Sequence, residues 1–285
     1  EALSSLYERA REWQPLAEVL EKRSYQLSGA SELVALLQKL GMIYADKLGD
    51  DDGAVRAFKR LLEIDSTDRR AQEQLKKRYT ALKAWDDLEE FYTGTDKWDE
   101  LIRILEREAE DSKMEPEERI AIYFRVGRLW QEKKEKPDRA ARAYEKIFNI
   151  DKQNLEAAEA LTPIYEQVSD ARKLAEVYDV RLLHYRVPEQ RLMLLREAGL
   201  LYEEKLRKPQ NAFDKYLEAF GLDPMQEVLR EDIGRIAPKV EGWERVFAVY
   251  EQAVEGAVDP DRATRLRIDY GRTLSDTGKI EEAIV

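Results

Sequence analysis

The sequence predicts an all-α fold, an α-solenoid in which antiparallel helix hairpins stack on one another. Three observations support this prediction. Four glycines with closely similar surroundings recur at separations of 86, 72 and 72 residues. The segments between them have the apolar spacing of short helices, and no stretch keeps the β-branched alternation that is typical of strands. A fixed period of this kind outweighs local propensity in assigning the fold.

The repeat is defined by what surrounds each glycine. The four positions are Gly41, Gly127, Gly199 and Gly271. Around the first three, an aromatic residue stands at +3, an alanine at +13 and a second aromatic at +17. In chain order these are Tyr44, Trp130 and Tyr202; Ala54, Ala140 and Ala212; and Phe58, Tyr144 and Tyr216. Weaker copies lie between, so each 72-residue period contains two units of about 36 residues, each with two short helices.

Close helix packing explains these residue types. Glycine inside a helix costs about 1 kcal/mol relative to alanine, so its recurrence predicts that a neighbour comes too near for a side chain. The small alanines allow the same approach, and the aromatics fill the volume between helices. Four tryptophans at the predicted starts of second helices are assigned to the packed core with Trp130. They are Trp13, Trp85, Trp98 and Trp243.

The repeated residues resemble the tetratricopeptide repeat, in the combination of Leu40-Gly41 with Tyr44, of Ala54 with Phe58, and in Leu222-Asp223-Pro224. The glycine-to-alanine spacing is one residue longer than is usual in that family. The resemblance covers essentially the whole chain and is similar to large bacterial proteins with many such repeats. It implies a right-handed superhelix whose concave groove, lined by the first helices of the hairpins, binds other proteins.

The repeat boundaries predict one solenoid over residues 1–285, interpreted as a fragment of a longer array. The expected units are 1–30, 34–66, 69–113, 118–152, 155–187, 190–224, 227–258 and 262–285, the first and last partial. Leu3 to Lys22 is expected to form a single second helix. The unit 69–113 is irregular because a 13-residue segment that begins at Tyr79 is duplicated from Tyr92, either a docking feature or a tolerated insertion. Pro163 and Pro238 are candidate helix kinks.

Composition narrows the function. The chain has a formal net charge of −11, no cysteine and one histidine, His184. Cysteine nucleophiles, cysteine-based zinc sites and most histidine-based acid–base chemistry are therefore excluded, and we expect no enzyme, no metal and no cofactor. An acidic chain is poorly suited to nucleic acids, and no apolar run is long enough for a membrane span. We expect protein partners and a cytoplasmic location, with the periplasm as the alternative.

Candidate groove residues follow from the resemblance. In the first helices with the strong glycine motif they are Gln38, Met42, Ala45, Phe124, Arg128, Gln131, Arg196, Leu200, Ile268 and Arg272. In the weaker first helices they are Glu73, Lys77, Glu159, Glu231 and Arg235. The lysine–asparagine pair with which some family members hold a carboxylate terminus is absent. The arginines either bind acidic groups of a partner or pair with the glutamates of this set.

The resulting hypothesis is a non-enzymatic scaffold that binds one or more proteins along the groove through contacts from successive helices. Two alternatives remain open. One is a regulatory module that senses a peptide, and the other is a structural spacer that self-associates.

Overall fold

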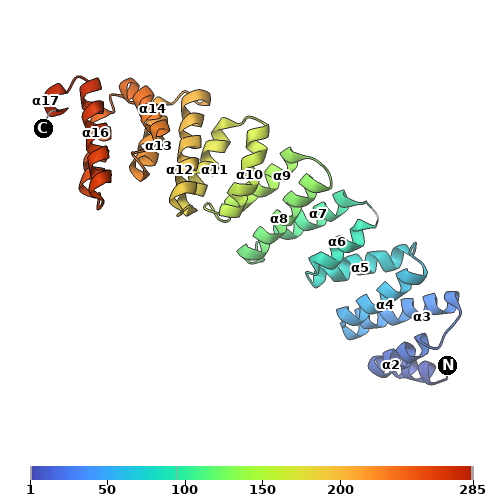
Figure 1. The fold of residues 1–285 in the computed structure, drawn as a ribbon. Coiled ribbons are helices and arrows are strands. Elements are labelled where there is room, and N and C mark those ends of the chain that lie inside the picture. Colours follow the sequence, from blue (N-terminus) through green and yellow to red (C-terminus); the bar gives the residue numbers. More distant parts are fainter. Residues whose placement is uncertain (1, 95, 284–285) are drawn as a thin grey trace. The chain divides into compact units, whose positions relative to one another are not determined.

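The computed structural model describes residues 2–94 and 96–283, and throughout them the regular structure is helical (Figure 1). Residues 1, 95, 284 and 285, which fall in the first, irregular and last expected units, lie outside the described residues. The chain divides into two compact units, Glu1–Ile104 and Leu105–Val285. In both, helices adjacent in the chain pack against each other, which confirms the all-α hairpin fold.

The first unit contains α1 (Ala2–Ala10), α2 (Trp13–Ser24), α3 (Ala30–Ile43), a π-helical turn η1 (Tyr44–Leu48), α4 (Asp51–Ile64), α5 (Arg69–Ala81) and α6 (Trp85–Thr93). The expected single helix from Leu3 to Lys22 is wrong. The chain breaks at Arg11, where φ is 58°, and α1 and α2 pack on each other as a hairpin.

The duplicated segment forms an additional helix. Its two copies begin α6 at Trp85 and α7 (Trp98–Ala109) at Trp98, and α7 begins in the first unit and ends in the second. Three helices, α5 to α7, therefore lie where the period provides for two. This explains physically why the first glycine interval is longer than the others.

The second unit continues with α8 (Pro116–Glu132), α9 (Pro137–Phe148), α10 (Leu155–Gln167), α11 (Ala171–His184), α12 (Pro188–Leu200) and a π-helical turn η2 (Leu201–Lys205). It ends with α13 (Pro209–Leu222), α14 (Glu227–Ile236), a 3-10 turn η3 (Ala237–Val240), α15 (Trp243–Glu255), α16 (Pro260–Asp276) and α17 (Ile280–Ala283). Proline opens several of these helices, where its missing N–H costs nothing.

The two candidate kinks behave differently. Pro163 lies inside α10, which continues to Gln167. Pro238 lies in η3, beyond the end of α14 at Ile236, so it shortens the α-helix and tightens the turn that leads to α15.

The repeated glycines do face a neighbour that leaves no room for a side chain. A Cβ built on Gly41 would lie 2.7 Å from the ring of Phe58, and one on Gly127 or Gly199 would overlap the ring of Tyr144 or Tyr216. The neighbour in each case is the +17 aromatic of the same hairpin, and these rings are buried. The ring therefore lies directly over the helix backbone, and the glycine and the aromatic act as one packing unit.

Two parts of the predicted core differ from the structure. Gly271 meets no ring: the nearest atom to an added Cβ is the carbonyl oxygen of Ala283, at 3.6 Å. Of the five tryptophans only Trp98 is buried, at 7% exposure. The others are half-buried at the edge of the helix layer, as for Trp13, whose ring has the ammonium group of Lys47 5.3 Å from its centre. Indole is large enough to pack on one face and stay in contact with water on the other.

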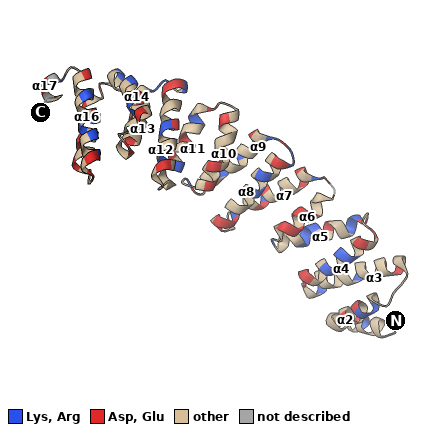
Figure 2. Ribbon diagram, in the orientation of Figure 1, with Lys and Arg blue, Asp and Glu red and all other residues tan. Residues whose placement is uncertain are grey.

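Charged residues of both signs lie along the helices (Figure 2). Many pair between neighbouring helices, as in Lys215 with Asp179 at 2.6 Å and Lys59 with Asp87 at 3.0 Å. Both of these pairs are partly exposed, so each contributes about 1 kcal/mol or less. Stability therefore comes mainly from the buried apolar faces.

Candidate binding surface of the first helices

Residues expected to line the groove lie on the first helices of the hairpins. Gln38 and Met42 are on α3, with Ala45 in η1; Glu73 and Lys77 are on α5; Phe124, Arg128 and Gln131 on α8; Glu159 on α10; Arg196 and Leu200 on α12; Glu231 and Arg235 on α14; and Ile268 and Arg272 on α16. All are half-buried or exposed. We call the exposed side chains of α8, α10, α12, α14 and α16 in the second unit the first-helix surface.

Charged residues on this surface do not pair as expected. The arginines were expected to bind either a partner or the glutamates of the same set. Arg196 instead bonds through Nε to Asp232, at 2.7 Å, and Arg272 lies 3.7 Å from Asp269 on its own helix. Neither aspartate was predicted. Within the part of the chain that the structure describes, Arg128 has no ion pair, so its charge remains available.

The glutamates of the set have other partners. Glu73 pairs with Lys76 one helical turn away, and Glu159 accepts a hydrogen bond of 3.1 Å from the Tyr185 hydroxyl. The pairing of the groove arginines with Glu73, Glu159 and Glu231 was therefore wrong. The reason is geometric: the arginine side chains reach one residue further round the facing helix, to positions that the repeat pattern treats as core.

Asp232 is the clearest case, because its side chain is 3% exposed. It accepts hydrogen bonds from Arg196 at 2.7 Å and from Arg235 at 2.8 Å. A buried carboxylate is costly unless it is paired, and here two guanidinium groups from α12 and α14 pair with it. The network joins two successive first helices across the surface.

Glu203 in η2 extends this network. Arg235 donates to both of its carboxylate oxygens, at 2.9 and 3.1 Å, and Lys239 donates at 3.3 Å. The hydrogen bonds from Arg235 lower the pKa of Glu203 to about 2. The Tyr216 hydroxyl also donates to it at 3.1 Å, which ties the ring that covers Gly199 to the charged surface.

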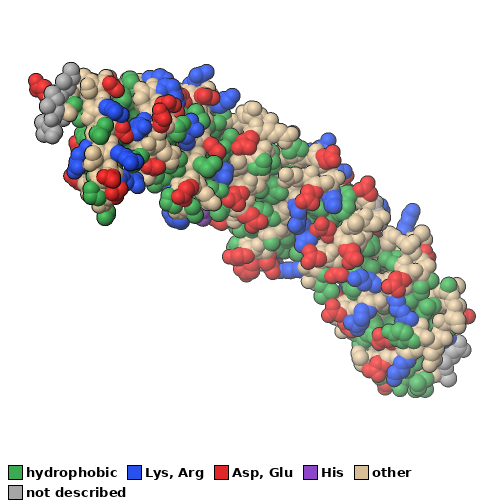
Figure 3. Space-filling model, viewed as in Figure 1, with side chains coloured by type: hydrophobic (Ala, Val, Ile, Leu, Met, Phe, Trp, Pro, Cys, Tyr) green, Lys and Arg blue, Asp and Glu red, His purple; other side chains and the backbone are tan. Residues whose placement is uncertain are grey.

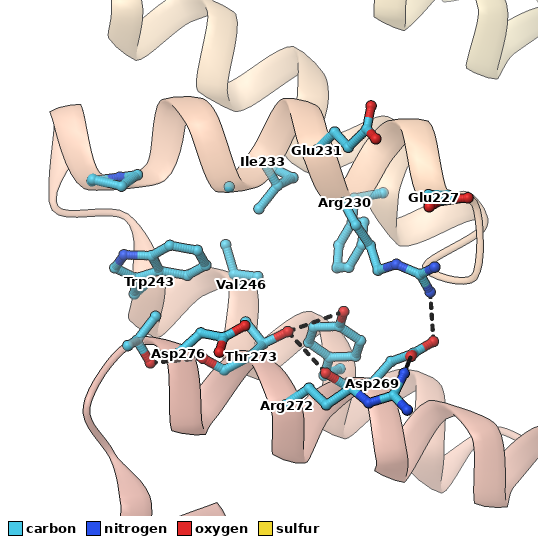
Figure 4. Close-up of a pocket in the computed structure, with 15 residues that line it drawn as sticks. Glu227, Arg230, Glu231, Ile233, Trp243, Val246, Asp269, Arg272, Thr273 and Asp276 are labelled. Atoms are coloured by element: carbon cyan, nitrogen blue, oxygen red, sulfur yellow. Dashed lines mark hydrogen bonds and ion pairs between the residues drawn. The ribbon is translucent and has the colours of Figure 1, made fainter.

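A pocket of about 670 Å³ opens on this surface between α14 and α16, with α15 behind it (Figure 4). Apolar and aromatic side chains line its depth, namely Phe220, Ile233, Pro238, Trp243, Val246 and Tyr250. Charged side chains line it too, namely Glu227, Arg230, Glu231, Asp269, Arg272 and Asp276. Two of the predicted residues, Glu231 and Arg272, are brought together here.

One end of the pocket is closed by an ion pair. Arg230 extends from α14 to Asp269 on α16, and Arg272 shares the same carboxylate (Figure 4). Beside them, Thr273 donates to the backbone oxygen of Asp269 at 2.9 Å and lies 3.4 Å from the Tyr250 hydroxyl. Burial raises the pKa of that tyrosine, so the hydroxyl stays protonated and serves as a hydrogen-bonding group.

The remaining carboxylates are not paired. No ion pair joins Glu227, Glu231 or Asp276 to any residue that the structure describes. The pocket lining holds four carboxylates and two guanidinium groups, a formal charge of −2. Repeat spacing alone could not reveal this pocket, but Trp243, which opens α15 between two first helices, was a signal for it.

The space-filling view also shows acidic, basic and apolar side chains interspersed over the visible face (Figure 3). Among the described residues, no group of three His, Asp or Glu side chains is placed to hold a metal ion. His184 is exposed, with Nε2 2.7 Å from the backbone oxygen of Gln153. None of the described helices combines the length and the apolar character that crossing a membrane requires.

Comparison with known proteins adds family matches over part of the chain. Models described as tetratricopeptide repeat match residues 34–68, which hold α3 and α4, and residues 84–120, which hold α6 and α7. The second match places a repeat of its own inside the irregular unit. No curated protein matches the sequence.

Several solved structures are similar over most of their length. One is described as PilF of Pseudomonas aeruginosa, with 14% identity over 90% of each chain and a TM-score of 0.29. Another is the C-terminal part of a repeat-containing protein from Cytophaga hutchinsonii, with 12% identity over 81% of this chain and 98% of that one and a TM-score of 0.35. BtubC from P. vanneervenii has 16% identity over 88% and 91%, with a TM-score of 0.31. Such low scores support no functional argument. The two family matches and the glycine–aromatic hairpins identify the chain as a member of the tetratricopeptide-repeat family.

Proposed function

We propose that the chain is a non-enzymatic scaffold that binds partner proteins along the first-helix surface. Proteins with this repeat are in general protein-interaction scaffolds, and they are typically not enzymes. The observation that supports the proposal most directly is the pocket between α14 and α16, where successive first helices leave an apolar depth with charged groups around it. Pockets of this size and character are the usual form of specific recognition sites.

The residues that surround the pocket suit recognition of an extended segment. Arg128, Arg196, Glu231 and Arg272 lie on successive or alternate first helices, so a segment that runs across the helices would meet each of them. Contacts of this kind are weak singly and add up along a repeat array.

Affinity capture from the native lysate with matched variants tests the proposal. One variant carries Arg128→Ala and Arg272→Ala on first helices, and the control carries Arg142→Ala and Arg172→Ala on the second helices α9 and α11. All four arginines are exposed, so both variants lose the same charge without disturbing the core. We expect proteins captured by the wild type and by the control to be depleted from the first-helix variant. Equal capture by all three forms, or capture by none, would reject the proposed surface.

A further inference from the structure

The pocket between α14 and α16 has a charge pattern that selects its ligand. Its two guanidinium groups already share the carboxylate of Asp269. Glu227, Glu231 and Asp276 have no ion partner among the described residues. The positive groups are therefore occupied and the negative groups are available.

Acidic and neutral ligands fit this pattern poorly. An acidic side chain would have to displace Asp269 from Arg230 or Arg272 and would face the other carboxylates, and such like-charge contacts cost several kcal/mol. A purely apolar side chain would remove water from carboxylates that gain no new partner, which is also costly.

A lysine or arginine side chain fits both parts of the pocket. Figure 4 shows Trp243 and Asp276 at the end of the pocket opposite the Arg230–Asp269 pair, with Val246 beside the indole. The methylene stem of a basic residue packs on apolar surface while its charged head stays at the edge. A cation over an indole ring gains further attraction, and a carboxylate at the same end pairs with it.

We propose that this pocket binds a segment of a partner protein through an arginine or lysine side chain, with its stem against Trp243 and Val246 and its head at Asp276 and Glu231. This inference rests on the proposed function, because it names the chemistry of the ligand for the same surface. The acidic balance of the whole chain, −11, speeds the approach of such a segment, but the specificity comes from the pocket.

The test uses three peptide probes with blocked ends and Gly-Ser flanks. Their centres are Arg-Leu-Arg, Glu-Leu-Glu and Ser-Leu-Ser. Binding to the full chain is measured by isothermal titration calorimetry at low and at moderate salt. The pocket variant carries Glu231→Gln and Asp276→Asn. The control carries Glu132→Gln and Glu204→Gln, which remove the same charge at exposed positions outside the pocket.

We expect the Arg-Leu-Arg probe to bind the wild type and the control equally, and the pocket variant about tenfold more weakly, a change that corresponds to about 1.4 kcal/mol. Binding should weaken with salt because the contacts are partly exposed. The other two probes should not bind.

Equal binding of the basic probe to the pocket variant and the control would overturn the inference, because attraction to the acidic surface in general would then explain it. Binding of the acidic or neutral probe with equal affinity would also overturn it, and so would the failure of every probe to bind. In each case the proposed function is decided separately by the lysate capture, whose variants leave Glu231 and Asp276 in place.

Discussion

The same substitution at two equivalent repeat positions should have opposite effects on stability. Gly199 lies under the ring of Tyr216, and an added Cβ would overlap that ring. Gly271 occupies the corresponding position in α16 but would place its Cβ 3.6 Å from a carbonyl oxygen, an ordinary contact. Both glycines lie inside helices. Gly199→Ala and Gly271→Ala therefore differ only in the presence of the ring.

The magnitude follows from two opposing effects. Alanine in place of a mid-helix glycine stabilises by about 1 kcal/mol. Overpacking of a filled core costs about 1–3 kcal/mol, and the upper end applies at Gly199 because Tyr216 is 0% exposed and its hydroxyl is bonded to Glu203. From these two principles we expect Gly199→Ala to destabilise α12 and α13 by about 2 kcal/mol and Gly271→Ala to stabilise α16 by about 1 kcal/mol.

Hydrogen exchange read by mass spectrometry is the appropriate assay, because repeat arrays do not unfold in a single two-state step and local opening is what the substitution changes. Protection of the peptides that cover α12 and α13 should fall about thirtyfold in Gly199→Ala. In Gly271→Ala, protection of α16 should rise by about fivefold. Equal or greater protection in Gly199→Ala than in the wild type would refute the argument that the ring excludes a side chain.

Three further predictions concern charge and backbone. Glu203→Gln should destabilise the second unit by about 1–2 kcal/mol near neutral pH; because the folded pKa of about 2 lies below the ordinary 4.5, this contribution is present above pH 4.5 and is lost as the pH falls toward 2, and thermal melts of both forms across that range would contradict it if their difference stayed constant. Gly49→Ala should cost about 1–2 kcal/mol because φ is +64° there, and an unchanged melting temperature would be the contrary result. Pro163→Ala should stabilise α10 by about 1–3 kcal/mol because it restores a backbone donor inside the helix, which slower amide exchange in α10 would show.

The repeat period predicted the fold well because it reports packing directly. Gly41 and Phe58 stand 17 residues apart, and that spacing brings the ring over the helix only if the two helices form a hairpin. The periodic signal therefore contained the tertiary contact as well as the secondary structure. The same reasoning failed at Gly271, which keeps the motif without the ring, because residue type at one position does not show whether its partner is present.

The remaining differences have local causes. The break at Arg11 depends on one residue with positive φ, which apolar spacing does not reveal because α1 and α2 share a continuous apolar pattern. The pairing of Arg196 with Asp232 could not be predicted from the repeat either. Long flexible side chains choose their partners by reach and by burial, and the period fixes only where the Cα atoms lie. The charged half of the pocket is subject to the same limit.

The contact between each glycine and its ring has a consequence for how the chain folds. It closes over only 17 residues, as between Gly127 and Tyr144, so the main packing event of a hairpin is local in sequence. Proteins dominated by such short-range contacts reach the native state rapidly, in microseconds to milliseconds. A newly synthesised hairpin can therefore close before the next has left the ribosome, and a duplicated segment such as the one that formed α6 can be added without waiting for distant partners.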